Sequence, residues 1–257
     1  MRTDKRTSTQ RLLLAGRLAA TGLVAATLGL TAALPAQAAA PTGVVLADRA
    51  TTVDAAKRLV TARIDGRLAV LRANGVAINN AARLSDGHQA ALKAILDQAV
   101  TGLTELKAKV AGETTLEALK ADARSMVEDY RVYILVQKQV HLTLAADVET
   151  AAVARLRTAY DKLGKAIAAA KAAGKDVGDA EAKLADMKAQ LDKAEAAVSG
   201  VADALLAVKP GPDAEAIKAQ TQAARGKVRD GRTALKAAIA DAKAIRDLVK
   251  DKAAKSK

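Results

Sequence analysis

The clearest periodicity in this chain lies in residues 181–208, EAKLADMKAQLDKAEAAVSGVADALLAV. Its apolar residues recur at alternating steps of three and four, which places them on one stripe of an α-helix. In heptad notation, position a holds Leu184, Leu191, Val198 and Leu205, and position d holds Met187, Ala194, Val201 and Val208. The pattern predicts one helix that packs against a second helix, and Pro210-Gly211-Pro212 ends it.

The same spacing continues after these prolines, in a helix predicted to begin near Asp213. Position a then holds Thr221, Val228, Leu235, Ala242 and Val249, and position d holds Ile217, Ala224, Gly231, Ala238 and Ile245. Small residues at position d let two helix backbones approach closely. Short turns between long helices predict antiparallel neighbours.

Earlier residues show the same helical pattern with different ends. A helix is predicted over 48–79, and Ser85 is a good N-cap for a second helix that ends at Gly112. Thr114 and Glu117 form a T-x-x-E capping box for a third helix. The unbroken apolar run 132–136 could be a strand by itself, but helical spacing on both sides predicts helix.

No Pro or Gly interrupts the chain between Gly112 and Gly164, so the third helix is free to continue into the stripe that begins at Val153. The predicted fold class is therefore all-α, with long antiparallel amphipathic helices in an elongated, coiled-coil-like bundle. Residues 48–137 form one predicted layer of three helices, and residues 138–253 form a second layer with a basic last helix. Residues 254–257 are predicted to be a disordered tail.

The first 38 residues have the three parts of a secretory signal peptide. A basic start contains Arg2, Lys5, Arg6, Arg11 and Arg17, and an uncharged apolar run from Leu18 to Leu34 follows. Ala36 and Ala38 then form an A-x-A cleavage site after Pro35. We expect cleavage after Ala38, with Ala40 as the second choice, a flexible lead over 39–47 and a secreted, extracytoplasmic protein. The alternative is an uncleaved membrane anchor, for which ~17 apolar residues is the lower limit.

The inventory of reactive side chains is small. The chain has no Cys, and its only His residues are His88 and His141, neither of which stands in a metal-binding spacing. We expect His88 to be an exposed residue near a helix start and His141 to be partly exposed or satisfied by neighbours. Tyr130 and Tyr133 are expected to pack in the protein. No catalytic, metal-binding or cofactor-binding residue is predicted, and no small-molecule substrate is identified.

Positive charge is concentrated at the C-terminal end. Residues 218–257 contain 12 basic and 4 acidic residues, whereas residues 39–217 contain 24 and 23. Eight of the basic residues fall at the adjoining heptad positions b and e and form one predicted anion-binding stripe: Lys218, Arg225, Arg229, Arg232, Lys236, Lys243, Arg246 and Lys250. The alternative is an ordinary solvated face that is partly paired with acids of a neighbouring helix. No aromatic residue lies among these basic residues, so base stacking is not available to the stripe.

The stretch from Arg58 to Val140 resembles a family of uncharacterised secreted, Ala-rich helical proteins of actinobacteria, and the likeness covers most of the chain after the predicted signal peptide. The resemblance rests on Arg63-Ile64-Asp65 with Leu68 and Leu71, Arg83-Leu84-Ser85, Leu116 to Lys120, Asp129 to Tyr133, Ala234 to Ala238 and Asp241 to Lys243. Pro often follows the Tyr-Arg-Val-Tyr segment in that family, whereas Gln137 and Lys138 stand there in this chain. The resemblance implies export and helicity but no activity.

Three functions are compatible with these observations. The leading one is an exported non-enzymatic helical protein that associates with anionic cell-wall polymer or a membrane surface, or with another helical protein, through its basic last helix. The alternative is a secreted enzyme or metal-binding protein whose site forms only on folding, in a pocket that contains His141 or clustered acids. A nucleic-acid binder is the weakest of the three, because the signal peptide opposes it.

Overall fold

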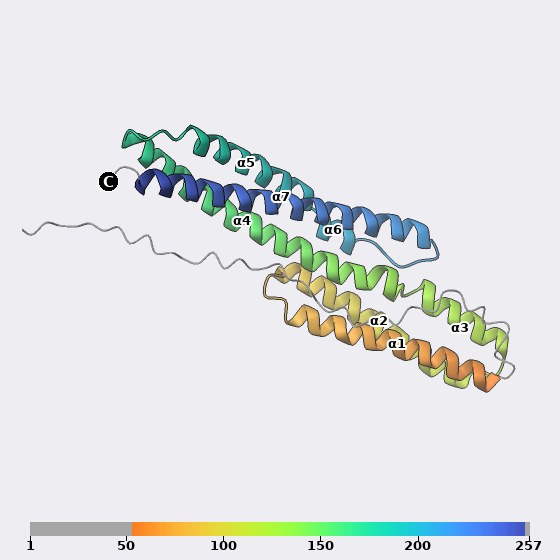
Figure 1. Cartoon of the computed structure of the whole chain (residues 1–257). Helices are drawn as coiled ribbons and strands as arrows, with labels where there is room; N and C mark the ends of the chain where they lie inside the picture. Colours follow the sequence, from red (N-terminus) through yellow and green to blue (C-terminus); the bar gives the residue numbers. More distant parts are fainter. Residues whose placement is uncertain (1–52, 255–257) are drawn as a thin grey trace, which may run out of the picture. The chain divides into compact units, whose positions relative to one another are not determined.

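The computed structural model describes residues 53–254, with side chains as far as residue 250. The predicted signal peptide, the flexible lead and the predicted start of the first helix at Asp48 lie outside these residues. Within the described part the chain forms helices and turns without a strand, so the all-α prediction is confirmed. The helices are α1 (Val53–Asn79), α2 (Asp86–Gly112), α3 (Leu116–Glu128), the π-helix η1 (Val132–Val136), α4 (Gln137–Ala172), α5 (Gly178–Val198), α6 (Val201–Leu206) and α7 (Ala214–Ala254) (Figure 1).

The C-terminal helices α4, α5 and α7 lie side by side and share one apolar core (Figure 1). The predicted seam residues Met187, Leu191, Leu235, Ala238 and Ile245 are all buried there. The apolar stripes of α5 and α7 therefore face each other, and Leu184 and Val249 of the same stripes are partly buried against this core. Contacts between α1 and α4 join the predicted layers 48–137 and 138–253 into one unit.

The helices α2, α3 and α7 begin close to the predicted residues. The Ser85 hydroxyl accepts the backbone N–H of His88 and so caps α2, which ends at Gly112 as expected. The cap of α3 is Thr115, whose hydroxyl accepts the N–H of Ala118, so the predicted box at Thr114 is wrong by one residue. Asp213 caps α7 by accepting the N–H of Ala216.

The chain does not run as one helix from α3 into α4, so the expectation of a continuous third helix is wrong. Arg131 adopts a left-handed conformation with φ 43°, which ends α3 and starts η1. A non-glycine residue rarely adopts this conformation without compensation. Here the Arg131 guanidinium donates from Nε to the Gly211 carbonyl and from Nη2 to the Pro212 carbonyl, at 2.6 Å each. The run 132–136 is helical, as predicted, and not a strand.

A second break divides the helix predicted over 181–208. Gly200 has φ 67°, and it separates α5 from the short helix α6. The buried Gln139 of α4 then donates from its amide to the carbonyl oxygens of Leu205 and Val208, at 2.8 and 3.0 Å. The Leu205 carbonyl also accepts the backbone N–H of Val208, so the Gln139 amide adds a second donor to the end of α6.

Candidate anion-binding face and the polar contacts around it

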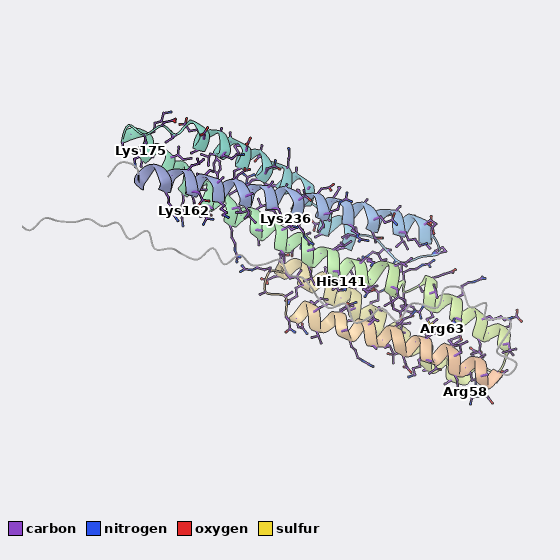
Figure 2. All side chains as sticks on the ribbon, in the orientation of Figure 1. Arg58, Arg63, His141, Lys162, Lys175 and Lys236 are labelled. Carbon is purple, nitrogen blue, oxygen red and sulfur yellow. The ribbon has the colours of Figure 1, made fainter. Side chains whose placement is uncertain are left out.

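All eight residues of the predicted stripe lie on α7, and seven of them are exposed. Heptad positions b and e border the buried a and d seam, so side chains there project to solvent while the seam faces α4 and α5. Figure 2 shows one of these side chains, Lys236, on α7. We call the seven exposed residues the basic face: Lys218, Arg225, Arg229, Lys236, Lys243, Arg246 and Lys250.

Two residues of the basic face have acidic partners on their own helix. Lys218 Nζ lies 2.6 Å from Glu215 Oε1, and Arg229 Nη2 lies 3.2 Å from Asp230 Oδ1. Both pairs are exposed, and exposed pairs are weak and easily exchanged. The other five make no ion pair with the side chains of residues 53–250: Arg225, Lys236, Lys243, Arg246 and Lys250. Their positive charge is therefore available to a ligand.

One large apolar residue lies among the residues of the basic face. Ile239 occupies an e position between Lys236 and Lys243, and it is 40% exposed. An isolated exposed isoleucine is normal on a protein surface. It gives the basic face little apolar area with which to enter a lipid bilayer.

Arg232 differs from the rest of the predicted stripe, because it is only partly exposed and its guanidinium turns to Glu149 of α4. Arg232 Nε lies 3.2 Å from Glu149 Oε1. The Glu149 side chain is 1% exposed, and its Oε2 has no hydrogen-bond partner in the described part of the chain. Burial raises the pKa of Glu149 to about 7, although the charge of Arg232 and its hydrogen bond act in the opposite direction.

The sequence prediction does not include Glu149 as a site residue, although its place in the apolar pattern is unusual. Glu149 stands four residues before Val153, so it occupies a seam position in an otherwise apolar stripe. An acidic residue in such a position is expensive to bury without a partner. Gly231, at a d position of α7, makes room for it: a Cβ there would lie 2.8 Å from Glu149 Oε2 and 2.7 Å from Val198 Cγ1.

A second polar cluster forms around His88, whose expected exposure is wrong. The ring is partly buried, with Nδ1 2.8 Å from Asp147 Oδ1 of α4 and Nε2 3.2 Å from Asp203 Oδ1 of α6. The Ser85 N–H also donates to Asp147 Oδ2 at 2.8 Å. Burial lowers the pKa of His88, but the hydrogen bonds with the two carboxylates outweigh it and the pKa is raised.

The remaining candidate residues do not gather into a site. His141 is exposed on α4 (Figure 2). Tyr130 packs against Gly102 of α2, as expected. Tyr133 is 41% exposed, and the Arg67 guanidinium lies over its ring, 5.1 Å from the ring centre. Ala36 and Ala38, the predicted cleavage residues, lie outside the described residues.

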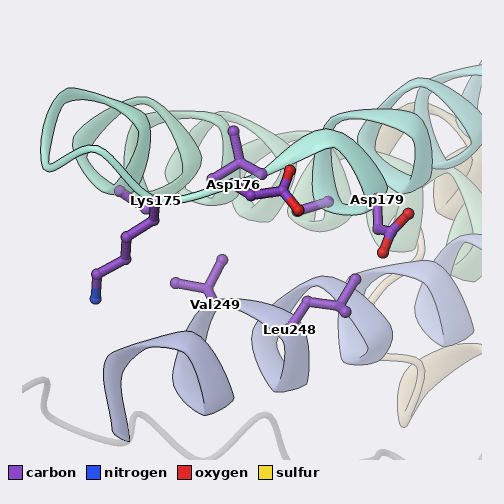
Figure 3. Close-up of a pocket in the computed structure, with 8 residues that line it drawn as sticks. Lys175, Asp176, Asp179, Leu248 and Val249 are labelled. Atoms are coloured by element: carbon purple, nitrogen blue, oxygen red, sulfur yellow. The ribbon is translucent and has the colours of Figure 1, made fainter. Parts of the chain in front are cut away.

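Hollows in the described surface are small or open. The cavity in Figure 3, between the α4–α5 turn and the end of α7, has a volume of about 10 Å³, which is room for one water molecule at most. Two open hollows of about 330 and 190 Å³ run along α6 and the start of α7, and neither contains His141.

Among residues 53–254 no group of three or more His, Cys, Asp and Glu side chains could hold a metal ion. The cluster of His88, Asp147 and Asp203 does not form a metal site, because the two carboxylates contact opposite ring nitrogens and do not converge on one point. No described helix has a stretch long and apolar enough to cross a membrane.

Comparisons with known proteins identify no relative. No protein-family model matches the chain, and neither the curated proteins nor the solved structures contain a significant match. The resemblance to secreted helical proteins of actinobacteria therefore stays a prediction.

Proposed function

We propose that this protein is an exported, non-enzymatic helical protein that binds anionic cell-wall polymer through the basic face of α7. The observation that carries the proposal is the set of five exposed basic side chains without an ion-pair partner among the described residues. They belong to one side of one helix, and a polymer that lies along that helix can contact them in succession.

The geometry favours a linear ligand. The basic face extends from Lys218 to Lys250, which corresponds to roughly 48 Å of helix at 1.5 Å per residue. Lys and Arg act here as point charges that attract phosphate groups and release counterions. Binding of this kind depends on charge density and not on the chemical sequence of the polymer.

Wall polymer is the ligand that the basic face fits better than a lipid bilayer or a nucleic acid. An amphipathic helix binds a bilayer by inserting an apolar side. The apolar side of α7 is buried against α4 and α5, and Ile239 is the one large apolar residue of the basic face. The α7 sequence also contains no aromatic residue on which a base could stack.

Export is the second part of the proposal and rests on the first 38 residues. A basic start, an apolar run and the Ala36 and Ala38 cleavage motif together support secretion. N-terminal sequencing of the extracellular protein should begin at Ala39, or at Pro41 if cleavage follows Ala40. Recovery of the chain with an intact Met1 from a cytosolic fraction would contradict export.

The binding proposal is tested with the mature protein and isolated walls that bear teichoic acid. Affinity should fall roughly a thousandfold between about 50 mM and about 500 mM salt, because about four contacts release counterions. The variant Arg225→Glu, Lys236→Glu, Lys243→Glu, Arg246→Glu should lose binding and keep its helical circular dichroism, because these side chains lie outside the core.

A matched control carries the same change of charge elsewhere. Arg58, Arg72, Lys93 and Lys120 lie on α1, α2 and α3, are exposed, and have no ion pair in the described part of the chain. Their replacement by Glu should weaken binding much less. Equal losses in both variants, or no binding to walls at low salt, would overturn the proposal. Stronger binding to acidic vesicles or duplex DNA than to walls would mean that the ligand is a lipid surface or a nucleic acid and not wall polymer.

A further inference from the structure

Arg232 lies between residues of the basic face but does not contribute its charge to it. It lies three residues after Arg229 and four before Lys236, so the same side of α7 carries all three. Its guanidinium is instead held by Glu149, with Nε 3.2 Å from Oε1. While Glu149 is ionised, the positive charge of Arg232 is neutralised at the place where a polymer would pass.

Glu149 is poorly suited to staying ionised. Its side chain is buried, it receives one hydrogen bond, and its Oε2 has no partner in the described part of the chain. Val198 of α5 and the backbone carbonyl of Ala194 lie beside Gly231, as Glu149 Oε2 does, and both are uncharged. Among the described residues, Arg232 of α7 is the one charged group that acts on the carboxyl. A buried carboxylate with so few donors favours its protonated form.

We propose that Glu149 couples polymer binding to protonation: a proton taken up by the Glu149 carboxylate frees the charge of Arg232, and the basic face then binds polyanions more tightly. This inference rests on the proposed function, because it describes the regulation of the same face. No covalent change is involved. The proton comes from solvent, and the Arg232–Glu149 ion pair is exchanged for a contact between Arg232 and an anionic group.

The sign of the effect follows from the burial of Glu149. Above its pKa of about 7, moving Arg232 to the polymer would leave an unpaired negative charge inside the bundle, which is costly. Below that pKa the carboxyl is neutral, and Arg232 can turn outward at little cost. Affinity should therefore rise as the pH falls. By linkage, bound polymer should raise the pKa of Glu149 further.

Dextran sulfate is a suitable probe, because its sulfate esters stay ionised over the whole pH range. For the mature protein we expect binding to be roughly tenfold tighter at about pH 5.5 than at about pH 8.5, within the usual range of coupling between sites. Glu149→Gln removes the ionisable group and keeps the side-chain shape. It should bind at both pH values as tightly as the wild type binds at the lower one.

Two further variants separate Glu149 from other groups. Arg232→Gln should bind at both pH values as weakly as the wild type at the higher pH. His88→Asn should keep the wild-type pH dependence, because His88 of α2 contacts Asp147 and Asp203 and does not contact Arg232. These variants matter because the pKa of His88 is also raised in the folded protein, by its hydrogen bonds with Asp147 and Asp203.

The outcomes separate this inference from the proposed function. Absence of binding at both pH values would overturn both proposals. Binding without pH dependence, or with a dependence that Glu149→Gln retains, would overturn the coupling and leave the basic face as a binding site. Carboxyl carbon NMR gives a measurement independent of the variants: the pKa of Glu149 should rise when dextran sulfate binds, and an unchanged value would contradict the coupling.

Discussion

At the scale of single residues, Gly231 and Glu149 depend on each other. α7 passes so close to α4 and α5 at this point that only a residue without a Cβ leaves room for both the Glu149 carboxyl and Val198. The requirement concerns space and not backbone freedom, because Gly231 has no positive φ. A glycine in a helix interior normally reduces stability, so close packing here offsets a local cost.

Gly231→Ala should therefore lower the free energy of unfolding by about 1–3 kcal/mol, the usual range for overpacking. The added methyl would lie 2.7 Å from Val198 Cγ1. Gly226→Ala on the same helix is the control, because a Cβ there meets nothing within 4 Å. It should stabilise the protein by roughly 0.5–1 kcal/mol. Urea denaturation measures both, and similar effects of the two substitutions would show that Gly231 is not tightly packed.

His88 can donate to both of its carboxylate neighbours only when its ring is protonated. A neutral imidazole has one N–H, so it can donate to Asp147 or Asp203 but not to both, whereas the imidazolium donates to both. The pKa of His88 is raised above 6.5 in the folded protein. Its contribution to stability is therefore complete below pH 6.5 and is lost as the pH rises through the folded pKa.

His88→Asn keeps one donor near Asp147 but cannot reach Asp203 as well. At about pH 5.5 it should reduce the free energy of unfolding by about 1 kcal/mol or more, the range for hydrogen bonds to charged groups. The reduction should become smaller at about pH 8.5. Urea denaturation at the two pH values, in a Glu149→Gln background, isolates the effect of His88. A difference that is the same at both values would mean that the bridge does not depend on protonation.

At the scale of helices, Arg131 connects the break between α3 and α4 to the loop that precedes α7. Its two hydrogen bonds reach the carbonyl groups of Gly211 and Pro212, which are 80 and 81 residues away in sequence. The left-handed backbone of Arg131 aims the guanidinium at that loop. These hydrogen bonds connect the loop before α7, where the basic face begins, to the start of η1.

Arg131→Gly keeps the backbone conformation accessible and removes both bonds. Amide hydrogens over 214–217, in the first turn of α7, should then exchange roughly tenfold faster, which corresponds to the loss of about 1.4 kcal/mol. Amides near Leu235, in the buried middle of α7, should exchange at the wild-type rate. Mass-spectrometric hydrogen exchange measures both segments. Unchanged exchange over 214–217 would show that Asp213 and Gln139 hold the loop without Arg131.

At the scale of the whole molecule, stability should decline from acidic to neutral pH. Glu149 binds its proton more tightly in the folded state, where its pKa is about 7, than at the ordinary value of 4.5. The folded state is thus favoured below pH 4.5, loses this advantage between pH 4.5 and 7, and above pH 7 its stability no longer changes with pH through Glu149. His88, whose pKa is raised from 6.5 by its two carboxylate partners, adds a decline of the same sign.

The free energy of unfolding from urea denaturation should therefore fall between about pH 5 and about pH 8. Glu149→Gln should flatten the lower part of this decline and raise stability at the alkaline end, because it removes a buried charge. A wild-type stability that increases over the same range would show that Glu149 is not the dominant titrating group.

The sequence alone determined the helical class, most helix ends and the exposure of seven basic residues on α7. These properties depend on short-range spacing, because an α-helix satisfies its hydrogen bonds within four residues and presents its faces with a fixed period. Ser85 as the cap of α2 and the Leu191 and Leu235 seam were predictable for the same reason. Gly200 is a local signal of a helix break that the prediction from apolar spacing did not use.

Only the tertiary structure decided how the polar residues pair and where the third helix breaks. Arg232 meets Glu149 across 83 residues, and His88 meets Asp147 across 59. Arg131 takes a left-handed conformation because its partners are carbonyl groups of a distant loop. Periodicity states which face of a helix is apolar, but it does not state which acid a base on the border of that face will meet. That choice depends on which helices pack together, and in this protein it removes Arg232 from the basic face.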